Sequence, residues 1–279
     1  MSAPGSAVPI LRIEPAAGWT WPALGELWDF RELIGFLIWR DLKIRYKQTA
    51  LGIASAVLQP VLTMVLFSVI FGRVAKLPSD GVPYPLFTFA ALLPWQLFAG
   101  GITSAANSLV GSSGLITKVY FPRLVTPIAA VCATLVDFAI SFGVLLLMML
   151  SYGIGPSGAM VFLPAFVLLA LLTAFAAGLW LSAINVRYRD VRYALPFLIQ
   201  CWLFASPVAY STSLVPANAW RTLYGFNPLV ASIQGFRWAI LGAEAPTPFL
   251  LPSIVSAVVL AIGGLIYFRR MEDTFADVV

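Results

Sequence analysis

The sequence of 279 residues contains no histidine and only two cysteines, Cys132 and Cys201. Both cysteines lie in long apolar segments, so we interpret them as small core residues rather than as a disulfide framework. No glycine is followed by lysine, which excludes a phosphate-binding loop of the G-x-x-x-x-G-K-S/T kind. The serines and threonines have no imidazole partner, and no apolar segment carries paired carboxylates. The sequence therefore predicts no catalytic residue, no metal site and no cofactor in this chain.

Charged residues are also scarce. They make up 10% of the chain, whereas hydrophobic residues make up 60% and the mean hydropathy is +0.91. This composition leaves too little polar surface to cover a globule in water and indicates a membrane protein. The formal net charge is +5 and the pI is about 9.4, but the basic residues lie at the ends of apolar segments. That pattern indicates membrane topology and argues against nucleic acid as a partner.

Long apolar segments with few charges predict the membrane spans. We expect six spans, at about residues 51–72, 86–109, 124–150, 161–185, 194–212 and 250–268. The predicted fold class is therefore an all-α polytopic membrane protein with six transmembrane helices, and residues 51–270 form its transmembrane domain.

Residues 213–245 are long enough to cross the membrane but carry polar side chains. Asn227, Gln234 and Arg237 argue against crossing, because amide and charged groups are costly in hydrocarbon. We expect this stretch to form a re-entrant pair of short outer helices, with Pro228 at the turn.

The basic residues indicate the orientation, because cytoplasmic loops carry an excess of lysine and arginine. Six spans put eleven basic residues inside and four outside, which places both termini in the cytoplasm. The inside set is Arg40, Lys43, Arg45, Lys47, Lys118, Arg123, Arg187, Arg189, Arg192, Arg269 and Arg270, and the outside set is Arg73, Lys76, Arg221 and Arg237. We expect residues 1–26 to be a disordered cytoplasmic tail without a cleavable signal peptide, and residues 271–279 to be a second cytoplasmic tail.

An amphipathic helix is expected over residues 27–48, just before the first span. One side of its helical wheel is apolar and the opposite side is charged. The apolar arc comprises Leu27, Phe30, Leu33, Ile34, Leu37, Ile38 and Ile44, and the charged arc comprises Asp29, Glu32, Arg40, Lys43 and Lys47. We expect an interfacial helix lying along the membrane, which either anchors the first span or contacts a cytoplasmic partner or anionic lipid headgroups.

Asp137 is the only ionisable residue well inside a predicted span. An unpaired charge there costs roughly 2.5 to 3.5 kcal/mol on insertion scales, so the carboxyl group must be paired, protonated or facing water. We favour a hydrogen bond to a neighbouring helix, although the sequence does not identify the partner. A proton relay needs a chain of such groups, and no other carboxylate or histidine lies at this depth.

Aromatic residues make up 14% of the chain, and many lie near span ends, as in an interfacial belt. The predicted fifth span is unusual because it combines aromatic residues with Gln200 and Ser206. Aromatic faces stack on the apolar C–H surfaces of sugar rings, so a carbohydrate path is an alternative to lipid contact. The candidates are Trp202, Phe204 and Tyr210, followed by Trp95 and Phe98.

Four stretches resemble the membrane permease of type 2 ABC exporters for polysaccharides. They are "RDLKIRYKQTALGIASAVLQP", "LLPWQLFAGGITSAANSLVGSSGLITKVYFPR", "NVRYRDVRYALPFLIQCWLFASPVAY" and "LYGFNPL". They occur in the order typical of the family, and the resemblance covers about residues 28–270. Within the family, the sequence is more similar to the permeases for O-antigen and wall teichoic acid chains than to the capsule permeases.

This resemblance implies a permease homodimer that binds two copies of a separate ABC ATPase, where ATP and Mg²⁺ would bind. The implied substrate is an undecaprenyl-diphosphate-linked polysaccharide, above all O-antigen for lipopolysaccharide biosynthesis, exported across the bacterial cytoplasmic (inner) membrane. The helix at 27–48 and the connection "SSGLITKVYFPR" would contact the ATPase, and residues 213–245 would form the outer helices. The implied coupling residues are Leu115, Lys118, Tyr120, Phe121 and Arg123.

The lipid diphosphate of such a substrate is anionic, and it would enter past the basic cluster before the first span. The residues are Arg40, Lys43, Arg45 and Lys47. Their charges can attract a diphosphate, or they can serve only to orient the chain in the membrane.

Two other functions stay open. An ion- or proton-coupled small-molecule carrier would use Asp137 as its coupling site and would not need an ATPase. An integral membrane enzyme acting on lipid-linked glycan would need polar catalytic groups facing one aqueous side, and the sequence groups none convincingly.

Overall fold

The computed structural model describes residues 24–47, 51–155, 157–188, 190–216, 219–243, 245 and 247–278. Within these ranges every regular element is a helix, which confirms the predicted all-α class. The predicted N-terminal tail lies outside the described residues up to residue 23, and a helix begins at Leu24. At the other end, the last helix continues to Val278, through the range expected to be a tail.

Long helices alternate with short ones along the chain. The elements are α1 (Leu24–Asp29), α2 (Arg31–Lys47), α3 (Leu51–Phe67), η1 (Ser68–Val74), α4 (Tyr84–Gly111), α5 (Ser113–Ile116), α6 (Val125–Ser151), η2 (Gly158–Phe162), α7 (Leu163–Arg187), α8 (Val191–Phe204), η3 (Thr212–Leu214), α9 (Ala219–Gly225), α10 (Val230–Leu241), η4 (Pro248–Leu250) and α11 (Leu251–Val278). Among the described residues, five helical stretches are long and apolar enough to cross a membrane. They are Ala56–Val74, Tyr84–Gly111, Val125–Ser151, Gly158–Arg187 and Pro248–Glu272.

The predicted fifth span, residues 194–212, corresponds to the shorter helix α8. This helix has 14 residues and ends at Phe204, shortly before Pro207. At about 1.5 Å per residue it covers about 21 Å, less than the hydrocarbon core of about 30 Å. The six-span count and the re-entrant hairpin therefore remain predictions. Our interpretation of Cys201 as a core residue was wrong: α8 packs through Leu195 and Leu203, which leaves Cys201 exposed on another side of the helix.

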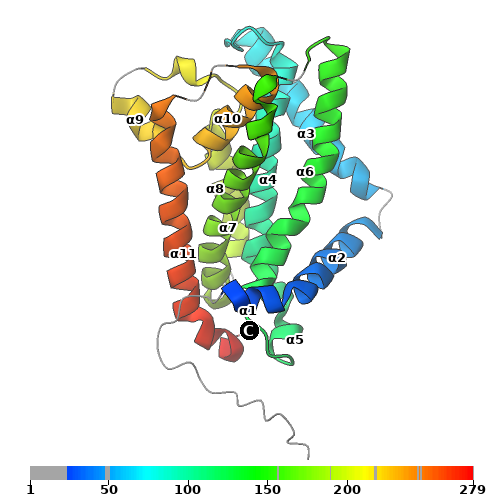
Figure 1. The fold of residues 1–279 in the computed structure, drawn as a ribbon, viewed down its shortest axis with the longest axis vertical. Helices are drawn as coiled ribbons and strands as arrows, with labels where there is room; N and C mark the ends of the chain where they lie inside the picture. Colours follow the sequence, from blue (N-terminus) through cyan, green and yellow to red (C-terminus); the bar gives the residue numbers. More distant parts are fainter. Residues whose placement is uncertain are drawn as a thin grey trace, which may run out of the picture.

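Helix α4 is the centre of the bundle, with α3, α6, α7 and α8 around it (Figure 1). In its most apolar window 78% of the residues are buried, compared with 17% to 28% for the other four candidate spans. Small residues let α4 and α7 approach closely: a Cβ on Gly178 would come within 2.5 Å of the Ala105 Cβ, and one on Gly101 within 2.9 Å of the Ala174 Cβ. Close packing through small residues is typical of helices in membranes.

Short elements gather at the two ends of this bundle (Figure 1). At one end, which we name the α5 end, lie α1, α2, α5 and the C-terminal turns of α11. At the opposite end, which we name the α10 end, lie α9, α10 and the loop before α4. Helix α2 runs obliquely upward from the α5 end along α6.

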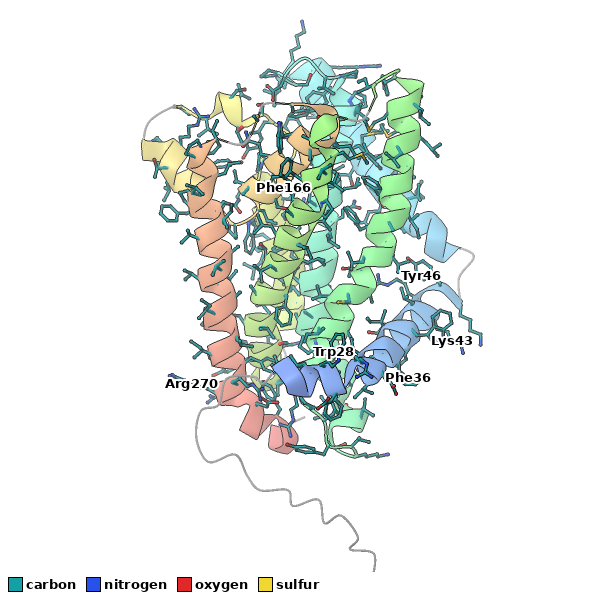
Figure 2. All side chains as sticks on the ribbon, in the orientation of Figure 1. Trp28, Phe36, Lys43, Tyr46, Phe166 and Arg270 are labelled. Carbon is teal, nitrogen blue, oxygen red and sulfur yellow. The ribbon has the colours of Figure 1, made fainter. Side chains whose placement is uncertain are left out.

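The amphipathic helix expected at 27–48 is two helices, α1 and α2, separated at Phe30. Its apolar arc, from Leu27 to Ile38, packs into a core that also contains Phe121, Phe268 and Phe275. The arc therefore faces protein at the α5 end rather than lipid. Ile44 does not join it, being 67% exposed. Another set of apolar side chains is exposed on the outer side of α1 and α2, together with Lys43 (Figure 2). This set comprises Trp28, Phe36 and Trp39.

Candidate functional site

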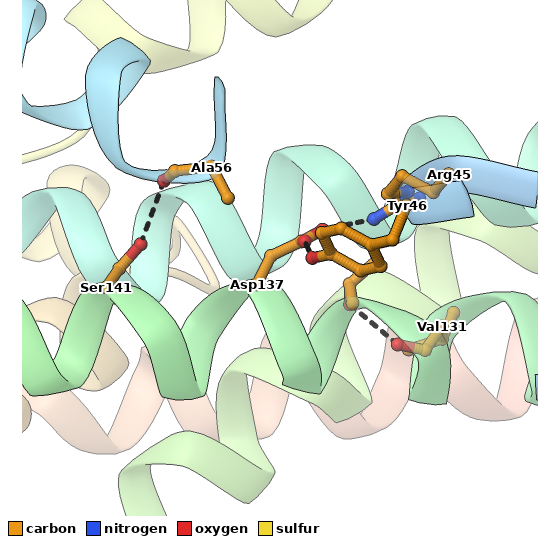
Figure 3. A network of polar contacts seen from close by, with 7 residues as sticks. Arg45, Tyr46, Ala56, Val131, Asp137 and Ser141 are labelled. Atoms are coloured by element: carbon orange, nitrogen blue, oxygen red, sulfur yellow. Dashed lines mark hydrogen bonds and ion pairs between the residues drawn. The ribbon is translucent and has the colours of Figure 1, made fainter. Parts of the chain in front are cut away.

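Asp137 lies within α6, about 18 Å along the helix from Val125. The guanidinium of Arg45 and the hydroxyl of Tyr46, both on α2, donate to its carboxylate, one to each oxygen (Figure 3). The sequence left the partner of Asp137 unidentified, and these two residues supply it. An opposite charge at this depth removes the cost of an unpaired carboxylate. Burial raises the pKa of Tyr46 to about 12, and the hydrogen bond to Asp137 acts in the same direction.

Ser141 lies one helical turn beyond Asp137, on the same side of α6. Its hydroxyl donates to the backbone oxygen of Ala56 on α3 at 3.2 Å (Figure 3). Tyr46 precedes the connection between α2 and α3, and Ala56 follows it. Helix α6 therefore holds the chain on both sides of the α2–α3 connection. We name Arg45, Tyr46, Ala56, Asp137 and Ser141 the α6 anchor.

The basic cluster expected to attract a lipid headgroup is divided by the structure. Arg40 donates to Asp41 at 2.9 and 3.0 Å and to the Ser112 hydroxyl at 3.4 Å. The second arginine of the cluster belongs to the α6 anchor. Lys43 and Lys47 are exposed on α2. An anion reaching this surface would meet the two lysines, whereas both arginines already have carboxylate partners.

The connection between α4 and α6 contains the five predicted ATPase-coupling residues, and their exposure differs. Tyr120 is 80% exposed and Lys118 is also exposed. Phe121 is only 5% exposed, and Leu115 packs against the same core at the α5 end. The connection thus presents Lys118 and Tyr120 to a partner while Leu115 and Phe121 hold it against the bundle.

Arg123, the last of these five residues, joins the connection to α11. Its backbone amide donates to Glu272 Oε1 at 3.2 Å, and its guanidinium donates to the Glu272 carbonyl oxygen. Arg269 pairs with the other carboxylate oxygen of Glu272 at 2.8 Å. Glu272 was missed by sequence reasoning, which treated everything after residue 270 as a tail.

An open groove of about 540 Å³ lies beside the end of α8. Its lining is mostly apolar and aromatic, with one amide. The lining residues are Trp202, Ala205, Val215, Trp220, Leu223, Tyr224, Asn227 and Pro228. The Trp202 indole donates to Asn227 Oδ1 at 3.1 Å, which fixes both side chains in the wall of the groove. Aromatic walls suit the apolar C–H faces of a ligand ring, and the fixed amide suits hydroxyl groups at the edge of that ring.

Trp202 is the member of the predicted aromatic set that lines this groove. Trp95 and Phe98 are 5% and 0% exposed, and the Phe98 ring packs edge-on against Trp202 at 4.9 Å. Phe204 is 54% exposed, and its backbone oxygen accepts a hydrogen bond from the Tyr210 hydroxyl at 3.2 Å. The structure therefore does not gather the five predicted residues on one surface. Periodicity gave no indication that Trp220 and Tyr224, on α9, would join Trp202.

Arg237, on α10, is a buried cation that the sequence analysis counted as an outside charge and as a polar residue that argues against crossing. Its side chain donates to the carbonyl oxygens of Phe87 at 3.2 Å, Tyr210 at 3.4 Å and Val208 at 2.6 Å. It also lies 3.6 Å from the centroid of the Phe87 ring. Burial lowers the pKa of Arg237 to about 9, so the group stays charged at neutral pH. The turn that follows α8 is thereby fixed to α4 and α10.

The described ranges contain no group of three or more His, Cys, Asp or Glu side chains that could hold a metal ion. The sites described above offer surfaces for binding and contacts that position helices: an aromatic groove, an exposed lysine pair and two polar links between distant helices.

Comparison with known proteins gives a consistent picture. Residues 32–241 match the ABC-2 type transporter family. An O-antigen export system permease protein, RfbA of Myxococcus xanthus, is 32% identical over 256 residues, which cover 90% of this chain and 97% of that protein. RfbA of Klebsiella pneumoniae is 26% identical over 258 residues, covering 92% and 97%. The polysialic acid transport protein KpsM of Escherichia coli is 24% identical over 243 residues, covering 85% and 92%.

Proposed function

Because the chain belongs to the ABC-2 type transporter family, we propose that it is the permease of an ATP-driven exporter that moves a lipid-linked polysaccharide across the bacterial cytoplasmic membrane. The observation that carries this proposal is the similarity to O-antigen permeases, which extends over 97% of the M. xanthus protein. The similarity to a polysialic acid transport protein agrees with a polysaccharide cargo. The substrate that we propose is O-antigen linked to undecaprenyl diphosphate.

The groove beside α8 supports a sugar-binding path. Trp202, Trp220 and Tyr224 offer ring faces on which pyranose rings can stack without a fixed pattern of hydrogen bonds. Such weak, repeated contacts let a long chain slide. Trp95 and Phe98 support Trp202 from the bundle interior, and we no longer assign them to the path.

The topology that we propose keeps six spans, with α8 and the turn after it as the fifth. Helices α9 and α10 then form the re-entrant outer pair, and both termini lie in the cytoplasm. In support, α1, α2, α5 and the end of α11 share the α5 end of the bundle (Figure 1). This end also carries most of the predicted inside charges.

The exporter that we propose is a homodimer of this chain with two copies of a separate ABC ATPase, which binds ATP and Mg²⁺. The ATPase docks at the α5 end, where Lys118 and Tyr120 are exposed. In the revised assignment the other three residues do not contact the ATPase but position this surface. Leu115 and Phe121 pack against the core at the α5 end, and Arg123 contacts Glu272 on α11. Lys43 and Lys47 attract the diphosphate headgroup, because both are cations of the basic cluster and are exposed on α2.

The carrier alternative loses its main support in this structure. Arg45 balances the charge of Asp137, and both oxygens of the carboxylate accept a hydrogen bond, so its presence in α6 is explained without proton transfer.

A measurement of ATP hydrolysis tests whether a separate subunit, rather than this chain, hydrolyses ATP. The purified chain alone should show no ATP turnover, and turnover should appear when its partner ABC ATPase is added. Turnover by a clean preparation of the chain alone would contradict the proposal, and a Walker-lysine variant of the ATPase controls for contamination.

A further inference from the structure

The α6 anchor joins two consecutive helices of the chain, α2 and α3, to α6. The apolar arc of α2 belongs to the core at the α5 end, where we propose that the ATPase docks. Helix α3 follows, and only 17% of its apolar window is buried, the lowest share among the five candidate spans of the described chain. Helix α2, at the α5 end, and the candidate span that begins in α3 are therefore both attached to α6 by the anchor.

Helix α3 also has the features of a helix that bends. Pro60 interrupts its backbone hydrogen bonds, and Ser68–Val74 continue it as a π-helix. Gly72 within this π-helix lies so close to Tyr84 that a Cβ would come within 2.8 Å of the ring. The outer half of α3 is thus irregular, whereas its inner half is held to α6 by the contact between Ser141 and Ala56.

We propose that Asp137 is a positioning residue for transport. It holds the end of α2 on α6, and Ser141 holds α3 on the same helix, so a displacement of α2 also displaces α3. Without it, α2 would move against α6 and α3 would stay in place. This inference rests on the proposed function, because it needs an ATPase that acts at the α5 end.

Connectivity favours this positioning role. The side chains of Arg45 and Asp137 are only partly buried, at 37% and 30% exposed. The pair joins residues 92 positions apart on two helices. By contrast, the pair of Arg40 and Asp41 joins neighbouring residues of α2 and cannot hold α2 on α6.

The test compares Asp137→Asn with Asp41→Asn in the whole exporter, reconstituted with its ATPase in vesicles. Both changes remove one carboxylate charge that faces an arginine of α2. For Asp137→Asn we expect normal assembly, ATP hydrolysis within about twofold of wild type and export per ATP reduced at least tenfold. For Asp41→Asn the export per ATP should stay at the wild-type value. An equal ratio in the two variants would overturn the proposal, as would a parallel loss of hydrolysis and export.

Exchange of the two charges provides a rescue. Arg45→Asp alone should uncouple the exporter, and Arg45→Asp combined with Asp137→Arg should restore most of the export per ATP. If Asp137 coupled transport to protons, the exchange would abolish transport, because position 137 would no longer carry a carboxylate. Restored export would therefore distinguish a positioning role from proton coupling. If the double variant fails to assemble, Tyr46→Phe decides: it removes one of the two contacts, and unchanged coupling would overturn the anchor.

Amide hydrogen exchange distinguishes failure of the anchor from failure of the proposed function, because it needs no substrate. Asp137→Asn should speed exchange in residues 44–47, at the end of α2 that Asp137 holds, more than Asp41→Asn does, whereas residues 56–60, held by Ser141, should exchange at the same rate in both variants. Equal exchange of residues 44–47 in Asp137→Asn and in the wild type overturns the anchor. Faster exchange of residues 44–47 in Asp137→Asn, together with a wild-type exporter that moves no glycan, would contradict the proposed function and leave the anchor in place.

Discussion

Arg123 and Glu272 are 149 positions apart in the sequence, yet they make two hydrogen bonds to each other. The carboxylate of Glu272 accepts from the Arg123 amide, and its backbone oxygen accepts from the Arg123 guanidinium. The surface that we assign to the ATPase is thereby fixed to the last turns of α11. The C-terminal segment of the chain is part of the docking site's support.

Glu272→Gln should weaken this support. The charge that holds Arg269 is lost, and the bond to the Arg123 amide becomes weaker, so we expect the free energy of unfolding to fall by about 1–2 kcal/mol. Recovery of the ATPase with the tagged permease should fall severalfold while membrane insertion persists. Glu32→Gln, on an exposed position of α2, is the matched control. Equal recovery of the ATPase by both variants would argue against this role for α11.

Arg237→Gln should destabilise the α10 end. Three carbonyl oxygens, those of Phe87, Val208 and Tyr210, lose their donor in a buried site, which costs about 3 kcal/mol or more. Arg237→Lys keeps the charge but not the planar fork and should lose less. Thermal unfolding in detergent measures both, with the exposed Arg73→Gln as control. A loss for Arg237→Gln no larger than the control's would show that the carbonyl contacts do not stabilise the fold.

Substitution of two tryptophans that differ in exposure distinguishes an effect on folding stability from an effect on transport. Trp220 is 66% exposed at the groove, so Trp220→Ala should leave unfolding almost unchanged and slow the export of long glycans more than short ones. Trp95 is 5% exposed, and Trp95→Ala should lower the free energy of unfolding by about 3–5 kcal/mol. Product length is read from gels of exported glycan. Normal export of all lengths by Trp220→Ala would remove the groove from the path.

The Tyr46 hydroxyl predicts a pH dependence at high pH. Its pKa is about 12 in the folded protein and 10 as the ordinary value, because burial and then the hydrogen bond to Asp137 favour the neutral form. Between these values the unfolded chain loses the proton while the folded one keeps it, so stability falls as the pH rises from 10 to 12. Below this window the contribution is fully present. Thermal unfolding of Tyr46→Phe should show a shallower fall across this window, and identical slopes would contradict the assignment.

The long helices could be predicted from the sequence because hydropathy alone determines them. Residues 86–109 and 124–150 were expected as spans, and the structure has helices at Tyr84–Gly111 and Val125–Ser151. The helical wheel also predicted which side of α2 is apolar. It could not show that this side packs against Phe121, Phe268 and Phe275, because amphipathicity looks the same towards lipid and towards protein.

The candidate sites were predictable only in part, for a physical reason. The Arg45–Asp137 pair and the Arg123–Glu272 link join residues far apart in the chain, and no local pattern encodes such a pairing. Likewise, an aromatic side chain such as Trp95 serves equally well in a core, an interfacial belt or a sugar-binding wall. Its burial decides between these roles, and burial follows from the tertiary packing.

Transport in sealed vesicles tests the central claim most directly. The chain and its ATPase are reconstituted together, a fluorescent undecaprenyl-diphosphate-linked O-antigen is placed in the leaflet that faces the ATPase, and its arrival on the opposite side is measured with a glycan-binding lectin. We predict arrival that requires both subunits and ATP, and that continues when ionophores abolish ion and proton gradients. Arrival without the ATPase, or arrival that stops with the gradients while ATP is present, would contradict the account.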